Sequence, residues 1–129
     1  MKTTFLTTLL TGFLTVMTIQ ALSIARIQVI HNSADAAAEK VDVWLDNKLI
    51  LDDFEFRTAT PFINAPAGIE FTLTIYPSDN SATETPLWSK SYILEKNKRY
   101  VLIANGIISS EGYNPATPFD IHVYDMARE

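Results

Sequence analysis

The sequence predicts an all-β domain, an immunoglobulin-like or fibronectin-like antiparallel β-sandwich of seven to eight strands. In residues 26–129 the dominant hydrophobic period is two, which is the period of half-buried strands. Turn residues interrupt this alternation at intervals of about ten residues, as they do in sandwiches and barrels. No long segment has the helical period of 3.6 residues. We therefore expect residues 26–129 to form a single β-sandwich domain.

The first 25 residues are predicted to be a cleavable signal peptide. Lys2 gives a positive start, and an uncharged apolar segment follows from Phe5 to Ile19. Small residues ending at Ala25 fit the cleavage rule, and Ala21 is the alternative position. The segment is Thr-rich and shorter than the roughly 20 apolar residues of a membrane span. We expect a secreted, periplasmic or surface protein that has no transmembrane anchor after cleavage.

Composition excludes several function classes. The chain has 10 basic and 15 acidic residues, a net charge of −5, which becomes −6 when Lys2 leaves with the leader. An acidic chain with scattered Lys and Arg argues against nucleic acid as a partner. The absence of cysteine excludes disulfides, thiol nucleophiles and zinc-thiolate sites. A domain of this size buries about two thirds of its unfolded surface, which is enough for a stable core.

The first half of the domain reads as strands joined by short turns. Residues 32–38 are small and polar and form a turn after the first strand. Val41, Val43 and Leu45 alternate with polar or aromatic neighbours, and Asn47 suits the tight hairpin turn that follows. The expected strands of this half are 26–31 (an exposed edge strand), 41–45, 49–51, a short extended stretch at 58–63, and 69–76 after a turn at 65–68.

The second half adds three strands and two loops. Residues 77–86 are polar and predict an exposed loop. Residues 100–104 are apolar on both faces, which predicts a central strand. Residues 105–118 contain two glycines and two prolines and predict a long crossing loop. The expected strands of this half are 87–94, 100–104 and a final one that starts at Phe119.

Four ordered motifs carry a resemblance to a known family. They are Val29–Ala36 (VIHNSADA), Val41–Asp46 (VDVWLD), Phe62–Gly68 (FINAPAG) and Tyr100–Gly106 (YVLIANG). Together they resemble a secreted prokaryotic family known only as domain of unknown function 4397. The resemblance implies an extracytoplasmic β-sandwich, often repeated in tandem, and it supplies no catalytic residues. The chain departs from the family pattern in two turns, after Asp35 and after Asp46.

Two histidines and an aspartate are the candidates for catalysis. His31 and Asp35 flank a tight turn, where the imidazole could reach the carboxylate or a turn carbonyl. An acid–base pair or half a metal site is one interpretation. We prefer a structural pair that fixes the turn, because no third residue completes a site. His122 lies on the face opposite the apolar residues of its strand, and we expect it to be solvated.

Other chemistry lacks a complete motif. Four carboxylates near the first hairpin could supply oxygens to calcium, but the loop pattern that would fix a coordination shell is missing; they are Asp42, Asp46, Asp52 and Asp53. Ser33, Ser109 and Ser110 lack a nucleophile elbow and a base. Glycine-rich phosphate loops are also missing. We therefore expect no catalytic residue, no metal and no cofactor.

Aromatic side chains are the most testable candidate surface. Trp44 and Tyr76 point away from the core faces of their strands, and Trp88, Tyr92 and Tyr113 are further candidates for exposure. Such a row could stack sugar rings or dock a protein. The alternative is that these side chains cover the second face of the sandwich, pack against the 105–118 loop, or sit under a neighbouring domain.

The sequence favours a non-catalytic module that binds, adheres or serves as a scaffold at the cell envelope. Its expected partner is an envelope protein or a polysaccharide. One alternative is a small extracytoplasmic hydrolase or metal-dependent enzyme that uses His31 and Asp35, in which His122 would have to converge with them. Another alternative is a structural spacer within a tandem-domain surface protein.

Overall fold

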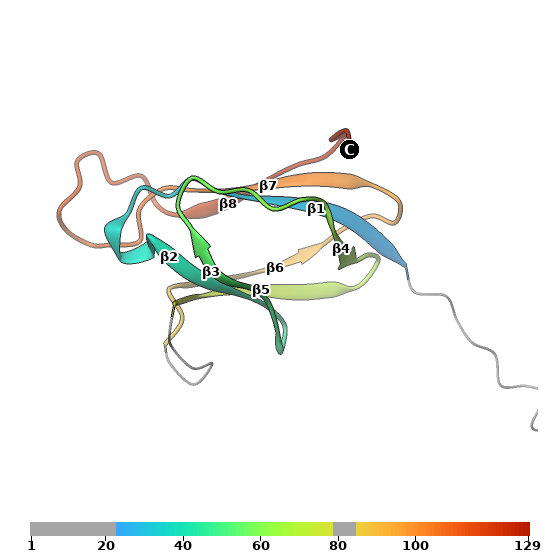
Figure 1. Ribbon diagram of the computed structural model, residues 1–129, viewed down its shortest axis with the longest axis horizontal. Coiled ribbons are helices and arrows are strands. Elements are labelled where there is room, and N and C mark those ends of the chain that lie inside the picture. The colour runs from blue at the N-terminus through green and yellow to red at the C-terminus, as the bar shows by residue number, and fades with distance from the viewer. Residues whose placement is uncertain (1–22, 79–84) are drawn as a thin grey trace, which may run out of the picture.

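The protein folds into two four-stranded β-sheets that face each other across one core (Figure 1). The computed structural model describes residues 23–78 and 85–129, so the predicted signal peptide lies almost entirely outside the described residues, as does part of the predicted loop 77–86. The elements are β1 (Ile24–His31), the 3-10 turn η1 (Ala36–Ala38), β2 (Lys40–Leu45), β3 (Lys48–Glu55), β4 (Ile63–Pro66), β5 (Glu70–Pro77), β6 (Trp88–Ile93), β7 (Arg99–Asn105) and β8 (Asp120–Tyr124). The predicted all-β sandwich is confirmed.

One sheet has the strand order β4-β1-β7-β8, and the other has the order β3-β2-β5-β6. Alternate residues of the central strands point inward, as the period of two predicts. In β5 these are Phe71, Leu73 and Ile75, all of them buried. Ile27 of β1 and Leu102 of β7 meet them from the opposite sheet, and all five belong to one hydrophobic cluster. No cysteine contributes, so this burial stabilises the fold.

The position of β1 differs from the prediction. Residues 26–31 were expected to form an exposed edge strand, but β1 is paired on both sides, antiparallel to β4 and parallel to β7. The parallel pair makes this sheet mixed, because β1 and β7 run in the same direction. Sequence alternation carries no information about which strand lies beside another, so this pairing was not predictable from the period. The prediction that 100–104 is a central strand is confirmed, because β7 lies between β1 and β8.

The predicted turn at 65–68 begins too early. Ala65 and Pro66 belong to β4 and pair with Ala25 and Ile24. A proline is tolerated there because β4 is an edge strand, where no partner needs its missing N–H group. The chain turns after Pro66, and Gly68 adopts a positive φ of 77°.

The first residues of β1 lie beside the predicted cleavage site. Ala25 is 0% exposed and lies in the core. The carbonyl of Ser23 accepts a hydrogen bond from the Ala67 N–H at 3.0 Å. Cleavage after Ala25 would remove both contacts, whereas cleavage after Ala21 would keep them.

The open edge between the two sheets is closed by β6 and the chain around β8. Three alternate residues of β6, Trp88, Lys90 and Tyr92, contact three successive residues at the start of β8, Phe119, Asp120 and Ile121. The Trp88 ring packs edge-on against Phe119, with ring centroids 5.3 Å apart. Lys90 pairs with Asp120 at 3.3 Å. The Tyr92 hydroxyl donates to the carbonyl of Ile121 at 3.2 Å.

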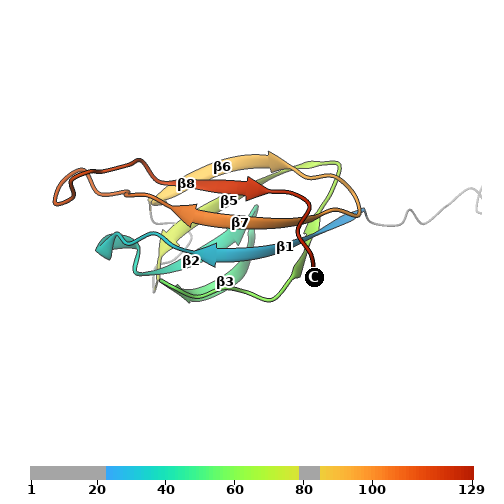
Figure 2. The ribbon, with the colours of Figure 1, turned by 90° about the horizontal axis from the view of Figure 1, so that it is seen from above.

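The loop at 105–118 extends beyond the end of the sandwich beside η1 (Figures 1 and 2). It closes on itself through hydrogen bonds from the Ile107 N–H to Thr117 and from the Phe119 N–H to Ile107. Within the described ranges 23–78 and 85–129, no helix has the length and apolarity needed to cross a membrane.

Candidate functional site

His31 is buried at the end of β1 and is used structurally. Its side chain is 2% exposed and lies against the rings of Phe54 and Phe56. Nδ1 accepts from the Ser33 N–H at 3.3 Å, so the proton is on Nε2, which donates to the carbonyl of Ala38 at 2.6 Å. Burial lowers the pKa of the imidazole, and the hydrogen bond to Ala38 opposes that shift only in part. Both ring nitrogens are therefore occupied within a neutral side chain.

Asp35 anchors the loop that follows β7. Its carboxylate is 1% exposed and accepts from the Ala37 N–H at 2.9 Å, which caps η1. Three further bonds come from across the fold: the N–H groups of Ile108 and Ser109, and the Ser109 hydroxyl, at 2.7 to 2.9 Å. Burial opposes ionisation of Asp35, but these hydrogen bonds outweigh it and hold the carboxyl pKa below its ordinary value.

The small-residue turn around Asp35 binds the same loop at further points. The buried Ser33 hydroxyl donates to the carbonyl of Gly106 at 2.7 Å. Asn32 donates to Asn105 at 2.7 Å. The Ala36 N–H donates to the Tyr113 hydroxyl at 2.7 Å, which places Tyr113 over η1. Tyr113 therefore serves as an acceptor that holds the turn.

The two histidines do not converge. His31 points into the core, whereas His122 is exposed on β8. His122 pairs with Ile103, the residue before the inward-facing Ala104 that pairs with His31. Adjacent residues of a strand point to opposite faces, so the two imidazoles lie on opposite sides of the sheet. The geometry expected for an enzyme that uses both histidines with Asp35 is not present.

The acidic residues near the first hairpin separate into two places. One carboxylate oxygen from each of Asp42, Asp52 and Asp53 lies within 4.8 Å of the others. Asp42 is buried and accepts from the Asp53 N–H at 2.9 Å, at the irregular part of the β2–β3 pairing. Calcium takes six to eight oxygens in typical sites, and one oxygen from each of these three residues supplies three of them. Asp46 is elsewhere, at the hairpin turn.

The five candidate aromatic side chains do not form a single row. Tyr113 lies over η1, and Trp88 faces the opposite sheet. Tyr92 also faces the opposite sheet, where its hydroxyl donates to the carbonyl of Ile121, and within its own sheet its ring centroid lies 6.2 Å from that of Phe71. Burial raises the pKa of the Tyr92 hydroxyl, and the neighbouring charge of Asp120 adds to this shift. Tyr113, Trp88 and Tyr92 thus have structural contacts that account for them.

Trp44 and Tyr76 are different, because they lie on the outer face of the β3-β2-β5-β6 sheet. They come from adjacent strands, and their rings meet edge to face at 78° with centroids 6.4 Å apart. Both side chains are half-buried. An open hollow of about 310 Å³ lies beside them, lined by the two rings and by Asp46 and Asn47 of the hairpin turn. The size is at the lower end of the range for small-molecule sites.

Hydroxyl groups continue this outer face toward β6. Thr72 and Ser91 are paired across the strands with their oxygens 2.9 Å apart. Thr74 and Ser89 form a similar pair at 3.3 Å. Thr74 is also the neighbour of Trp44 on β2. An aromatic pair, a turn with polar side chains and a row of hydroxyls thus share one face.

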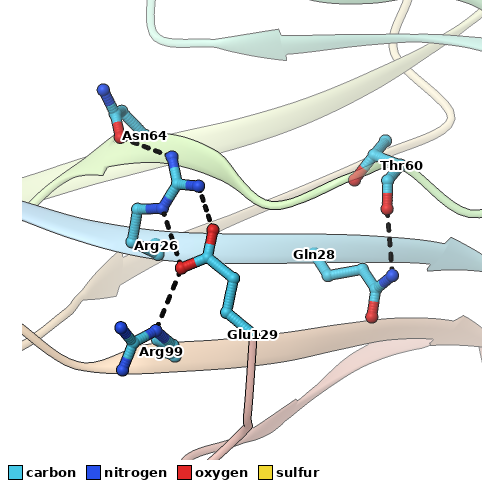
Figure 3. Close-up of polar contacts among 6 residues, drawn as sticks. All are labelled: Arg26, Gln28, Thr60, Asn64, Arg99 and Glu129. Atoms are coloured by element: carbon cyan, nitrogen blue, oxygen red, sulfur yellow. Dashed lines mark hydrogen bonds and ion pairs between the residues drawn. The ribbon is translucent and has the colours of Figure 1, made fainter.

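The outer face of the other sheet has its charges paired within the chain. Arg26 of β1 and Arg99 of β7 both bind the carboxylate of Glu129, with Arg99 Nε at 3.0 Å (Figure 3). Arg26 also donates to Asn64 of β4 at 3.0 Å. The two arginines lower the pKa of Glu129. The segment before Glu129 lies along β7, because the Ala127 N–H donates to the Arg99 carbonyl at 3.2 Å.

A small cavity between the sheets belongs to the core. It measures about 20 Å³, and its exposed lining is apolar. That volume holds about one water molecule, which would find too few polar partners there. The hollow beside Trp44 is therefore the stronger candidate for binding a ligand.

Sequence reasoning missed the polar half of this surface. In the sequence, Asp46 and Asn47 indicate a hairpin turn and Asp46 is also a possible calcium ligand, whereas the hydroxyl pairs follow no motif. Strand parity was the available signal, because Thr72 and Thr74 share the face of Tyr76 in the predicted strand. The alignment of β6 beside β5, which brings Ser89 and Ser91 to that face, depends on register and was not visible in the sequence.

The motifs around His31, Trp44, Gly68 and Tyr100 all fall within one family match. No curated protein matches the chain. The family model covers residues 25–120, which is the sandwich from β1 to the start of β8. The chain therefore belongs to the family described as Domain of unknown function (DUF4397).

Proposed function

We propose that the protein is a non-catalytic binding module of the cell envelope or extracellular space. Its binding surface is the outer face of the β3-β2-β5-β6 sheet. The observation that carries the proposal is the half-buried Trp44–Tyr76 pair beside an open hollow. Large aromatic side chains that remain partly exposed contribute strongly to binding energy when a partner covers them.

The other candidate residues have structural roles. His31 and Asp35 are buried and fully engaged in holding the turn and the 105–118 loop. Trp88 closes the edge of the sandwich against Phe119. The chemistry of this chain thus favours recognition on one outer face over reaction at a buried centre.

The test is retention on immobilised envelope extracts and polysaccharides. Trp44→Ala should lose most of the retention and keep a melting temperature close to that of the parent protein, because it removes an outward ring. Trp88→Ala is the matched control. It should lower the stability by about 2–4 kcal/mol, because it deletes a large aromatic side chain from a packed contact, and should retain binding below its melting temperature. Equal retention of the parent and Trp44→Ala would show that this surface does not mediate the binding.

Export is part of the same proposal, and two contacts at the start of β1 support cleavage before Ser23. Ala25 fills the core, and Ser23 accepts a hydrogen bond from Ala67. We expect N-terminal sequencing of the exported protein to show a start at Leu22, after cleavage at Ala21. A mature chain that begins at Arg26 and has full stability would contradict the expectation, as would a protein that stays inside the cell with its leader.

A further inference from the structure

We propose that the hollow beside Trp44 and Tyr76 binds one ring of a neutral polysaccharide, whose chain continues over β5 toward β6. This inference rests on the proposed function and names the class of ligand. The surface combines three features that a sugar requires: an aromatic face, fixed hydrogen-bonding groups beside it, and a low density of positive charge.

The aromatic pair supplies the apolar contact. One face of a pyranose ring carries mainly C–H groups, which pack against the π-face of an indole. Trp44 and Tyr76 stand at 78° to each other, so a ring that stacks on one of them meets the other at its edge. A corner of this kind fixes the orientation of the sugar as well as its position.

The hairpin turn supplies a rigid polar group at the rim. The Asp46 N–H donates to the Thr72 carbonyl at 2.8 Å, and the Asp46 carboxylate accepts from the Thr72 N–H at 2.9 Å. Asp46 also has a positive φ of 50°. A group held at both its backbone and its side chain loses little freedom on binding, which preserves affinity. Asn47 beside it offers an amide that can both donate and accept.

The hydroxyl pairs of β5 and β6 extend the surface in one direction. Each hydroxyl can donate one hydrogen bond and accept others. Thr74 and Ser89 bond to each other and retain acceptor capacity for a sugar hydroxyl. Thr74 lies between Trp44 and Ser89 in the cross-strand row. A polysaccharide that leaves the hollow over Thr74 therefore meets a second polar contact on β6.

The charge of the hollow argues against an anionic polymer. Among the described residues that line the hollow, Asp46 is the charged one, and no lysine or arginine is present. The whole chain carries a net charge of −5. A uronate or sulfated polymer would be repelled and would lack a cationic partner at this position. Neutral hexose units avoid this cost.

Fluorescence offers a direct measurement. The chain has two tryptophans, so Trp88→Phe leaves Trp44 as the sole indole and keeps an aromatic ring against Phe119. We would titrate this variant with a neutral soluble β-glucan, a neutral soluble α-glucan, a galactomannan and, separately, alginate. At least one neutral polymer should change the Trp44 emission in a saturable way that 0.5 M salt leaves nearly unchanged, since screening acts on charges. Alginate should produce no saturable change.

Variants then test the geometry. Trp44→Ala should weaken binding of that neutral polymer about tenfold or more, measured by calorimetry, because a stacked aromatic contact contributes about one such factor. Trp44→Phe should recover much of the loss. Thr74→Val should weaken binding about threefold to tenfold, through the loss of a single hydrogen bond. His122→Ala, exposed on the outer face of the opposite sheet, is the control and should bind like the parent.

The outcomes separate this inference from the proposed function. Binding by none of the neutral polymers, or binding that Trp44→Ala leaves intact, would overturn the sugar site. Retention on envelope extract that depends on Trp44, survives periodate oxidation of glycans and is abolished by protease would identify a protein partner. That result would keep the binding surface and reject the polysaccharide. If no retention depends on Trp44, both the proposed binding surface and the polysaccharide site are rejected.

Discussion

At the scale of single residues, the buried polar side chains explain the most recognisable motif of the sequence. His31, Ser33 and Asp35 alternate along VIHNSADA and all point inward. Each meets a backbone group of a distant or neighbouring turn. Buried polar groups are costly unless they are hydrogen-bonded, so every partner here has to be in place. This requirement supports a structural role for the motif and gives no support to a catalytic one.

Asp35→Asn tests the role of the carboxylate. The amide has one acceptor oxygen where the carboxylate has two, so it cannot accept all four hydrogen bonds. We expect a loss of about 2–4 kcal/mol in the free energy of unfolding at pH 7, because charged acceptors in buried sites give the stronger hydrogen bonds. Denaturant unfolding measures this loss. Asp125→Asn, at an exposed ion pair with Lys98, is the control and should have a much smaller effect, because exposed ion pairs contribute little.

The same variant has a characteristic pH dependence. The pKa of Asp35 is lower in the folded protein than its ordinary value of 3.8. Its charged form therefore stabilises the fold above pH 3.8, and this contribution is lost as pH falls through the folded-state pKa. The stability difference between the parent and Asp35→Asn should shrink as pH is lowered below about 4. A difference that stays constant with pH would show that ionisation of Asp35 is unimportant.

Residue patterns predicted the direction in which side chains point better than they predicted which residues contact each other. Parity correctly placed Trp44 and Tyr76 on an outer face and the apolar partners of each strand inside. It could not show that Trp88 and Tyr92 meet the opposite sheet, because their contacts depend on how β6 lies over β8. It also could not show that the carboxylate of Asp35 bonds a loop more than seventy residues away.

At the scale of elements, the 105–118 loop depends on one glycine at its entry. Gly106 has a φ of +93°, and a Cβ built there would lie 2.4 Å from the carbonyl oxygen of Pro118. The loop returns to this point, where Ile107 forms a bridge with Pro118. Glycine is required for both reasons, the backbone conformation and the close approach of the two chain segments.

Gly106→Ala and Gly112→Ala form a matched pair. Both glycines have nearly the same positive φ, but a Cβ at Gly112 would have nothing within 4 Å. Gly112→Ala should cost about 1–2 kcal/mol from backbone conformation alone. Gly106→Ala should cost about 1–3 kcal/mol more, because of overpacking against the backbone. Thermal unfolding of both variants checks this. Equal costs would mean that the loop shifts freely away from the added methyl group.

The elements themselves were largely predictable from the sequence, and their pairing was not. Alternation identified the strands around Val43, Leu73 and Leu102, because each buries one face. The extension of β3 to Glu55 and the placement of Ala65 in β4 were missed, since both lie at sheet edges where alternation is weak. The parallel alignment of β1 with β7 joins segments about seventy residues apart, and only the complete fold determines it.

At the scale of the whole molecule, the two outer faces differ. The face of β4-β1-β7-β8 carries arginines that Glu129 already binds (Figure 3). The face of β3-β2-β5-β6 carries aromatic rings, a rigid turn and hydroxyls beside an open hollow. One face is thus occupied by contacts within the chain, and the other has the composition of a recognition surface.

In our proposal, this second face binds the partner and the rest of the molecule holds it in place. The most direct test measures binding and stability in the same samples of the parent protein, Trp44→Ala and Trp88→Ala, with one retained polysaccharide or envelope fraction as the probe. We expect Trp44→Ala to lose binding at unchanged stability and Trp88→Ala to lose stability with binding preserved. The opposite pattern, in which Trp88→Ala abolishes binding while folded and Trp44→Ala binds normally, would contradict the proposal.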